Sequence, residues 1–258
     1  MLATFLVLAL AITSEANGAY IFEHIGANNP TSEGWIAAST GTQTVTTGPV
    51  TNDGGSGIDS WGMDDNATNG QLYYAALPTL AESTYARAHG WRLSAELRFI
   101  PDSFGSESSV ATVSFFDGSV EAKLWSMFFR SDGNGNLTAS VLVDPKPSSP
   151  TKVVPGSILD YHLFELVFNG TSGTAQFFID GVRAFEDVTL AGHLGLPAGI
   201  PYVAFGIPDP LSNTAEARFS HVRFEIVPEA SSMVLAGLGS LGIGLYQVRR
   251  KRRSSAVV

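Results

Sequence analysis

The stretch Trp91-Arg92-Leu93-Ser94-Ala95-Glu96-Leu97-Arg98-Phe99 decides the fold class of this chain. Apolar and polar residues alternate along it without a break, which is the period of a β-strand that buries one face. A helix would instead repeat its apolar residues every three to four positions. The stretch therefore predicts a half-buried strand, and similar segments follow it along the chain.

Seven further segments predict further strands. Each is short and is bounded by Gly, Pro, Asp, Asn or Ser, at the spacing of an all-β sandwich or barrel. The segment 145–155 is rich in proline and is expected to be a surface loop. The predicted strands are residues 110–116, 122–130, 137–143, 161–168, 175–179, 202–207 and 217–227.

Local signals predict one hairpin and one helix. Asp180 and Gly181 separate two short apolar runs, and Asp-Gly in such a place is typical of a tight type I′ turn. Thr79 and Glu82 have the spacing of a capping box. They predict a short helix that Gly90 ends, just before the strand that begins at residue 91.

This series of strands and turns resembles the concanavalin A-like jelly rolls. The residues that carry the likeness are the runs 90–98, 130–133, 177–182 and 218–225. Within that group the chain is most similar to laminin-G-like modules and to the non-catalytic lectin-like domains appended to some sialidases. The resemblance implies a sandwich of two antiparallel sheets over residues 20–227, and it transfers no functional residue to this chain.

Composition limits the partners of the body, residues 20–227. Its 208 residues are enough for one sizeable core. They include 22 Asp and Glu against 10 Lys and Arg, a formal charge of −12, which argues against nucleic acid and anionic lipid as partners. The chain has no cysteine, so disulfides and thiolate chemistry are both excluded.

The amino-terminal residues have the character of a targeting segment. An apolar stretch over residues 2–12 is followed by small and polar residues, as in the apolar and cleavage regions of a signal peptide. The basic residues that usually precede such a stretch are missing. We expect a signal peptide over residues 1–19.

The last thirty residues combine a polar break, an apolar run and a basic cluster. Val227-Pro228-Glu229 precedes an apolar run that predicts a transmembrane helix over 231–248. The basic end, 249–253, is expected to stay in the cytoplasm and to leave the body outside.

This tripartite pattern resembles the PEP-CTERM sorting signal of exported bacterial proteins, with Ala230 in place of its second proline. The resemblance implies that an exosortase-type enzyme recognises the tail, residues 228–258. It leaves open whether the tail is cleaved.

Catalytic signatures are absent from the sequence. Glycosidases of the resembled fold carry paired carboxylates at Glu-x-Asp-x-x-Glu on one strand, and this spacing does not occur here. The nucleophile elbow, the P-loop and the HExxH pattern do not occur either. We therefore expect a protein that is not an enzyme, with a divergent glycoside hydrolase or lyase as an alternative.

A sugar-binding site needs an exposed aromatic ring with polar groups beside it. Trp61 is the expected platform, because it lies in a stretch rich in Gly, Asn and Asp. Arg92, Arg98 and Arg130 are expected to reach the carboxylates of anionic sugars, with surface ion pairing as the alternative. Trp125 lies on a segment that is apolar on both faces and is expected to be structural.

Asp59, Asp64 and Asp65 lie in the same stretch as Trp61 and are candidate metal ligands. Carboxylate oxygens on an adaptable backbone suit Ca²⁺. Laminin-G-like modules often bind calcium, so the resemblance points the same way. A calcium site is one expectation, and a solvated acidic loop that requires no cofactor is the other.

These observations predict an exported, membrane-targeted protein whose jelly-roll body binds extracellular or envelope polysaccharide without catalysis. The alternative is a structural or adhesive envelope module that binds protein or a second copy of itself. Neither the identity of the sugar nor the oligomeric state follows from the sequence.

Overall fold

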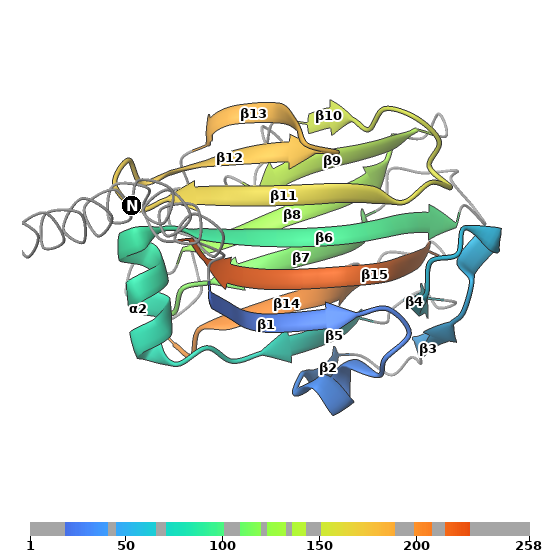
Figure 1. Ribbon diagram of the computed structural model, residues 1–258, viewed down its shortest axis with the longest axis horizontal. Coiled ribbons are helices and arrows are strands. Elements are labelled where there is room, and N and C mark those ends of the chain that lie inside the picture. Colours follow the sequence, from blue (N-terminus) through green and yellow to red (C-terminus); the bar gives the residue numbers. More distant parts are fainter. Residues whose placement is uncertain are drawn as a thin grey trace, which may run out of the picture. The chain divides into compact units, whose positions relative to one another are not determined.

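The body of the protein is a sandwich of two antiparallel β-sheets (Figure 1). Residues Tyr20–Ile226 form one compact unit. The predicted signal peptide and the tail beyond residue 227 lie outside the described residues. Among the residues that are described, no helix is both long enough and apolar enough to cross a membrane. The computed structural model describes residues 19–40, 45–65, 71–100, 109–119, 123–132, 136–142, 151–188, 199–207 and 215–227.

Sheet I has eight strands within the described residues. Their order is β13-β12-β11-β6-β15-β4-β3, and β1 also pairs with β15. The long strands β6 and β15 lie side by side at the centre of Figure 1. The strands are β1 (Ala19–Ile25), β3 (Thr46–Val50), β4 (Ser60–Asp65), β6 (Trp91–Ile100), β11 (His162–Asn169), β12 (Thr174–Ile179), β13 (Val182–Val188) and β15 (Ala215–Ile226).

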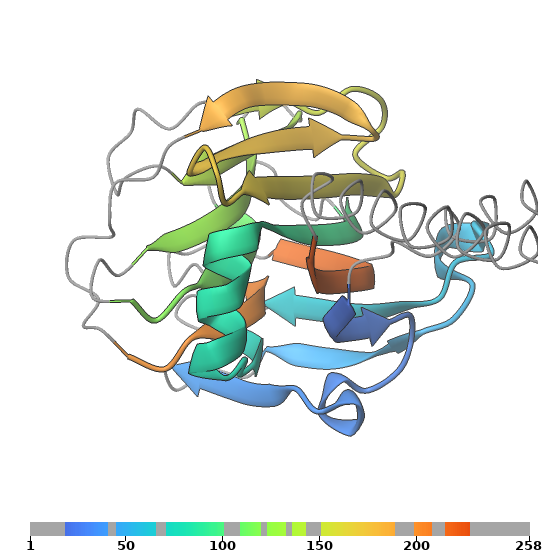
Figure 2. The same cartoon turned by 60° about the vertical axis from the view of Figure 1, so that its left-hand side comes forward.

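Sheet II has seven strands in the described part of the chain, in the order β10-β9-β8-β7-β14-β5-β2. One α-helix, α2 (Leu80–His89), lies beside the start of β6 in both views (Figure 1 and Figure 2). Two short 3₁₀ turns are η1 (Pro30–Glu33) and η2 (Asp53–Gly55). The strands are β2 (Ile36–Thr40), β5 (Gln71–Ala76), β7 (Ser109–Phe116), β8 (Leu124–Ser131), β9 (Leu137–Leu142), β10 (Thr151–Val153) and β14 (Tyr202–Ile207).

The predicted fold class is confirmed, since the described body is all-β with two antiparallel sheets and one short α-helix. The alternation that predicted β6 is present residue by residue, and its apolar side chains point into the core between the sheets. Each of these side chains is at most 1% exposed: Trp91, Leu93, Ala95, Leu97 and Phe99. Side chains from both sheets fill this core, which holds the sandwich together without a disulfide.

The two local signals are confirmed as well. Asp180 and Gly181 both have positive φ, 52° and 73°, as a type I′ turn requires, and they join β12 to β13. At the start of α2, the Glu82 backbone N–H donates to the Thr79 hydroxyl at 3.2 Å. The Thr79 backbone N–H donates to the Glu82 carboxylate at 2.7 Å, which completes the capping box.

Two expectations about loops are wrong. The proline-rich segment contains a short strand, β10, which pairs with β9. The stretch around Trp61 is not a loop, because β4 runs from Ser60 to Asp65 and pairs with both β3 and β15. β10 has only three residues, and β4 depends on pairing with β15, which is far away in the sequence, so the residues of these strands give a weak local signal.

A buried carboxylate fixes η2 to the outer side of sheet I. Asp53 is 3% exposed and accepts hydrogen bonds from Arg98 Nε at 2.6 Å and from the Tyr161 hydroxyl at 2.7 Å. A second guanidinium nitrogen of Arg98 contacts the other carboxylate oxygen. Burial opposes ionisation of Asp53, but these hydrogen bonds and the charge of Arg98 outweigh it and lower the pKa of the carboxyl below its usual value.

Substitution of this carboxylate should reduce stability in a pH-dependent way. Asp53→Asn should lower the free energy of unfolding at pH 7 by about 1–3 kcal/mol, because a buried Arg98 loses its counter-charge. A lowered pKa in the folded state stabilises the protein above the usual carboxyl pKa of about 4. The difference between the two proteins should therefore shrink as the pH falls below about 4, where the wild-type Asp53 also takes up a proton.

Urea denaturation followed by tryptophan fluorescence at several pH values measures this effect. Asp160→Asn, which removes an exposed carboxylate, is the matched control and should leave stability unchanged at each pH. A constant difference between Asp53→Asn and wild type down to pH 2 would contradict the assignment.

Candidate functional site

A pocket of about 180 Å³ lies at the end of the sandwich where α2, the start of β6 and the start of β8 meet. Strands contribute residues from both sheets, so the pocket exists only when the sandwich is closed. Its lining consists of Arg87, Trp91, Phe115, Asp117, Lys123, Trp125, Phe168, Gly170 and Gly173.

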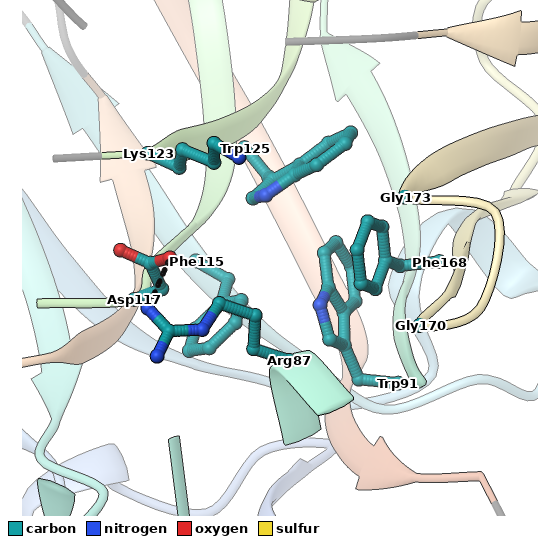
Figure 3. Close-up of a pocket in the computed structure, with 9 residues that line it drawn as sticks. All are labelled: Arg87, Trp91, Phe115, Asp117, Lys123, Trp125, Phe168, Gly170 and Gly173. Atoms are coloured by element: carbon teal, nitrogen blue, oxygen red, sulfur yellow. Dashed lines mark ion pairs between the residues drawn. The ribbon is translucent and has the colours of Figure 1, made fainter. Parts of the chain in front are cut away.

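One side of the pocket is aromatic (Figure 3). The ring of Trp91 stacks on that of Phe168 with centroids 5.4 Å apart, and it meets Trp125 edge-on at 5.5 Å. Trp125 and Phe168 meet edge-on at 5.0 Å. All three rings are largely buried, so they form a rigid apolar wall with a limited area open to a ligand.

The opposite side is charged. Figure 3 shows Arg87, Asp117 and Lys123 gathered there, across from the rings. Asp117 is 3% exposed, and its carboxylate accepts a hydrogen bond from the Ser119 backbone N–H at 2.9 Å. The Arg87 guanidinium lies 3.7 Å from the other Asp117 oxygen, which is an ion pair but exceeds hydrogen-bond distance.

The two indole groups also face the open space. In Figure 3 the nitrogens of Trp91 and Trp125 are turned toward the gap between the rings and the charged side. Neither indole N–H donates to another described residue. The pocket therefore combines an apolar wall with several hydrogen-bond donors, an arrangement that can bind a ligand with one apolar and one polar face.

Local structure places these groups. Arg87 is in the last turn of α2, and Gly90 ends the helix with φ 104° so that β6 begins directly at Trp91. The Ser83 hydroxyl donates to the Asp117 carbonyl at 2.6 Å, which ties the helix to the end of β7. Gly170 lies against the Ala88 carbonyl, where any Cβ would clash with the helix backbone.

Two other surfaces are weaker candidates. A pocket of about 230 Å³ near Leu137 and Val154 has neither a charged nor an aromatic side chain in its lining. The face of sheet II that points away from the core carries small hydroxyl side chains such as Ser114 and Ser126, whose oxygens are 2.6 Å apart. These side chains are less than a tenth exposed, so they offer little surface to a ligand.

The expectation that Trp61 is an exposed sugar platform is wrong. Trp61 is 5% exposed, because it shares the core-facing side of β4 with Met63. Its ring packs edge-on against Tyr74 of sheet II, with centroids 6.2 Å apart. Neither of the two pockets described above has Trp61 in its lining, so the ring presents no open face to a sugar there.

The three predicted arginines do not form one site. Arg92 and Arg98 lie six residues apart on β6, and Arg130 is on β8 of the other sheet. Arg92 pairs with Glu225 at 3.1 Å, and Arg98 is held by Asp53. The Arg130 guanidinium lies over the Phe128 ring, 5.8 Å from its centroid. For Arg92 and Arg98 the structure therefore favours ion pairing over sugar binding.

The predicted metal ligands are only partly described. The Asp59 carboxylate accepts a hydrogen bond from the Asn52 backbone N–H at 2.9 Å, and Asp64 is on β4. The side chain of Asp65 lies outside the described part of the chain. No group of three or more His, Asp or Glu among the described residues is arranged to hold a metal ion. The calcium site stays a prediction.

The residues that line the pocket were missed from the sequence as a site. The charged residues of the lining come from the last turn of α2 (Arg87), from the position after β7 (Asp117) and from the position before β8 (Lys123). Their spacing in the sequence therefore does not indicate a common site. Trp125 is structural, as expected, but one edge of it also faces the pocket. Charged residues directly at the ends of the apolar strands β7 and β8 are the one local signal for this site.

Comparison with known proteins first concerns the tail. Residues 227–252 match the PEP-CTERM protein-sorting motif, which confirms the predicted sorting signal. Of the predicted residues of this signal, Val227 is described, whereas Pro228 and Glu229 lie outside the described residues. Such a motif is typical of exported envelope proteins, and it says nothing of what the body binds. No curated protein sequence matches the chain.

Solved structures resemble the body at low sequence identity. A carbohydrate esterase from Shiga toxin-encoding bacteriophage phi24B aligns at a TM-score of 0.64 and 10% identity, over 81% of this chain and 99% of that chain. A sialidase aligns at a TM-score of 0.48 and 11% identity, over 83% of this chain and 19% of the sialidase chain. The carbohydrate recognition domain of Emp47p aligns at a TM-score of 0.48 and 8% identity, over 83% of this chain and 99% of that domain. At this identity the likeness to the esterase concerns the fold alone.

The close approach of Gly170 to α2 can be tested by adding one methyl group. Gly170→Ala should lower the free energy of unfolding by about 1–3 kcal/mol, because the new Cβ overlaps the Ala88 carbonyl and must displace the turn or the helix. Gly48→Ala is the matched control, because a Cβ there meets nothing within 4 Å. Denaturant unfolding of the two variants compares them, and equal stabilities would contradict the described packing.

Proposed function

We propose that this protein is exported to the cell envelope and binds polysaccharide there, without catalysis, through the pocket between α2, β6 and β8. The observation that carries the proposal is the meeting of an aromatic wall and a row of hydrogen-bond donors in one pocket. Sugars have apolar C–H faces and polar edges, and such a pocket offers a surface to each.

The size of the pocket supports a single sugar unit as the part that is bound. At about 180 Å³ it is smaller than the 300–1,000 Å³ that is usual for drug-sized ligands. One residue of a polysaccharide, either at a chain end or along the chain, is the expected occupant. The remainder of the polymer stays outside the pocket.

The sorting motif supports the location that this function needs. A protein that reaches the envelope meets the polysaccharide of the cell surface. In this proposal the signal peptide directs export, the tail anchors the chain in the membrane through residues 231–248, and an exosortase-type enzyme recognises the motif. The acidic body has no nucleic-acid partner in this scheme.

The composition of the pocket supports binding over hydrolysis. General acid–base cleavage of a glycoside uses two carboxyl groups on opposite sides of the bond. Among the residues that the structure describes, Asp117 is the one carboxylate in the lining, and it is already engaged by Arg87 and by the Ser119 backbone. The described lining also has no serine, histidine or cysteine that could act as nucleophile.

Loss of the Trp125 ring should remove sugar binding. Trp125→Leu in the full chain should weaken the affinity for a polysaccharide chosen on a glycan array by at least about tenfold, because the pocket loses part of its apolar wall. Trp61→Leu is the matched control. It also removes a buried tryptophan from the core, but one away from the pocket, and it should change the affinity by less than about twofold.

Both variants are first compared with wild type by thermal unfolding, and binding is measured well below the lower transition. Absence of binding to every glycan by the wild-type chain would contradict the proposal. An equal loss of affinity in Trp125→Leu and Trp61→Leu would contradict it as well. Shortening, elimination or deacylation of a bound polysaccharide would show that the protein is an enzyme.

The sorting role of the tail has its own test. In cells with an exosortase-type enzyme, recognition of the motif should pass the tail-anchored wild-type chain on from the inner membrane to the cell surface. The double substitution Pro228→Ala and Glu229→Ala should leave the chain in the inner-membrane fraction, because the motif that the enzyme recognises is lost. Ser254→Ala, beyond the matched residues, should behave as wild type. Cell fractionation and immunoblotting measure the result, and normal surface delivery of the double variant would contradict it.

A further inference from the structure

We infer that the pocket selects sugars that carry a carboxylate, which makes a uronic acid residue its ligand. This inference rests on the proposed function, because it names the class of sugar that the same pocket binds. The argument depends on which polar groups of the lining donate hydrogen bonds and which accept them.

Arg87 offers its donors to a ligand. Its side chain is 44% exposed, and its one carboxylate neighbour among the described residues is Asp117, 3.7 Å from the nearer guanidinium nitrogen. At that distance Asp117 attracts the guanidinium without occupying its N–H groups. The planar group can therefore donate two parallel hydrogen bonds to a carboxylate, which is the strongest pairing open to it.

Asp117 is a poor acceptor for a sugar hydroxyl. One of its oxygens accepts from the Ser119 backbone, and the other faces Arg87. The side chain is 3% exposed, so little of either oxygen is open to the pocket. The one side-chain acceptor in the described lining is thus already committed to the protein.

The other polar groups of the lining side chains also donate. The indole N–H groups of Trp91 and Trp125 are donors only. A neutral sugar presents hydroxyl groups that need acceptors as well as donors. A carboxylate presents acceptors only, so it matches this set without leaving a buried donor unpaired.

Matched pairs of ligands test the inference with the full chain. Oligogalacturonate, oligomannuronate and hyaluronan fragments are titrated calorimetrically beside their carboxyl-reduced forms, which keep the linkage and the hydroxyl groups but lose the charge. At least one acid form should bind about tenfold more tightly than its reduced form, as expected for a charge-assisted pair of hydrogen bonds. A sulfated oligosaccharide without carboxylates is titrated as a further comparison, and it should bind more weakly than that acid form.

Arg87→Gln should weaken the binding of the acid form more than that of the reduced form, so that the difference between the two forms is abolished. Arg183→Gln is the matched control. It removes one exposed arginine on β13, paired with Glu186, and therefore changes the net charge equally without touching the pocket. Thermal unfolding of both variants shows whether they are folded.

The outcomes separate the two proposals. Equal or tighter binding of the reduced forms overturns the inference and leaves the proposed function in place. A preference for acid forms that persists in Arg87→Gln overturns the inference too. So does a sulfated oligosaccharide that binds more tightly than the acid forms. Absence of binding by both acid and reduced forms, and by every glycan on the array, overturns the inference together with the proposed function.

Discussion

The antiparallel pairing of β6 with β15 is the interaction on which the rest of the structure depends. It extends from Ile100 opposite Glu216 to Trp91 opposite Ile226, and it is continuous apart from one irregularity after Phe219. β6 adds β11 on its other side, and β15 adds β4 and β1. Since the chain has no cysteine, the side chains that these two strands turn inward, together with those of sheet II, must hold the sandwich closed.

Trp91 connects this core to the candidate site. It is the first residue of β6, it is 1% exposed, and its ring is part of the aromatic wall of the pocket. The helix that carries Arg87 ends at Gly90, immediately before it. One short helix-to-strand junction therefore sets how far Arg87 lies from the aromatic wall.

The parts of the fold that the sequence predicts are those with strong local patterns. β6, the Asp180 turn and the capping box are each determined by residues within ten positions of one another. The strands before α2 were not predicted. They are five to seven residues long, and β2 and β3 consist largely of Ala, Ser, Thr and Gly. They form because distant strands supply their hydrogen bonds, as β15 does for β4.

The candidate site was hidden for a similar reason. Its lining comes from residues 87–91, 115–117, 123–125 and 168–173, which meet only in the closed sandwich. Trp61 was chosen from the composition of its neighbours, whereas its burial is decided by Tyr74 of the other sheet. Local alternation therefore predicted the class of fold correctly, whereas local composition predicted the exposure of Trp61 wrongly.

The acidity of the body explains why Arg87 stands apart from the other arginines. With 22 carboxylates for 10 cations, most arginines have a carboxylate oxygen within about 3 Å. These are Arg92, Arg98, Arg183, Arg218 and Arg223. Arg87 has only the longer contact to a carboxylate that is itself buried and bound elsewhere.

At physiological ionic strength charges are screened beyond about 8 Å, so the remote acidic surface repels a short ligand weakly. In the proposed function, the local donors of the pocket then decide which sugar is bound, so that an acidic protein can select an acidic sugar.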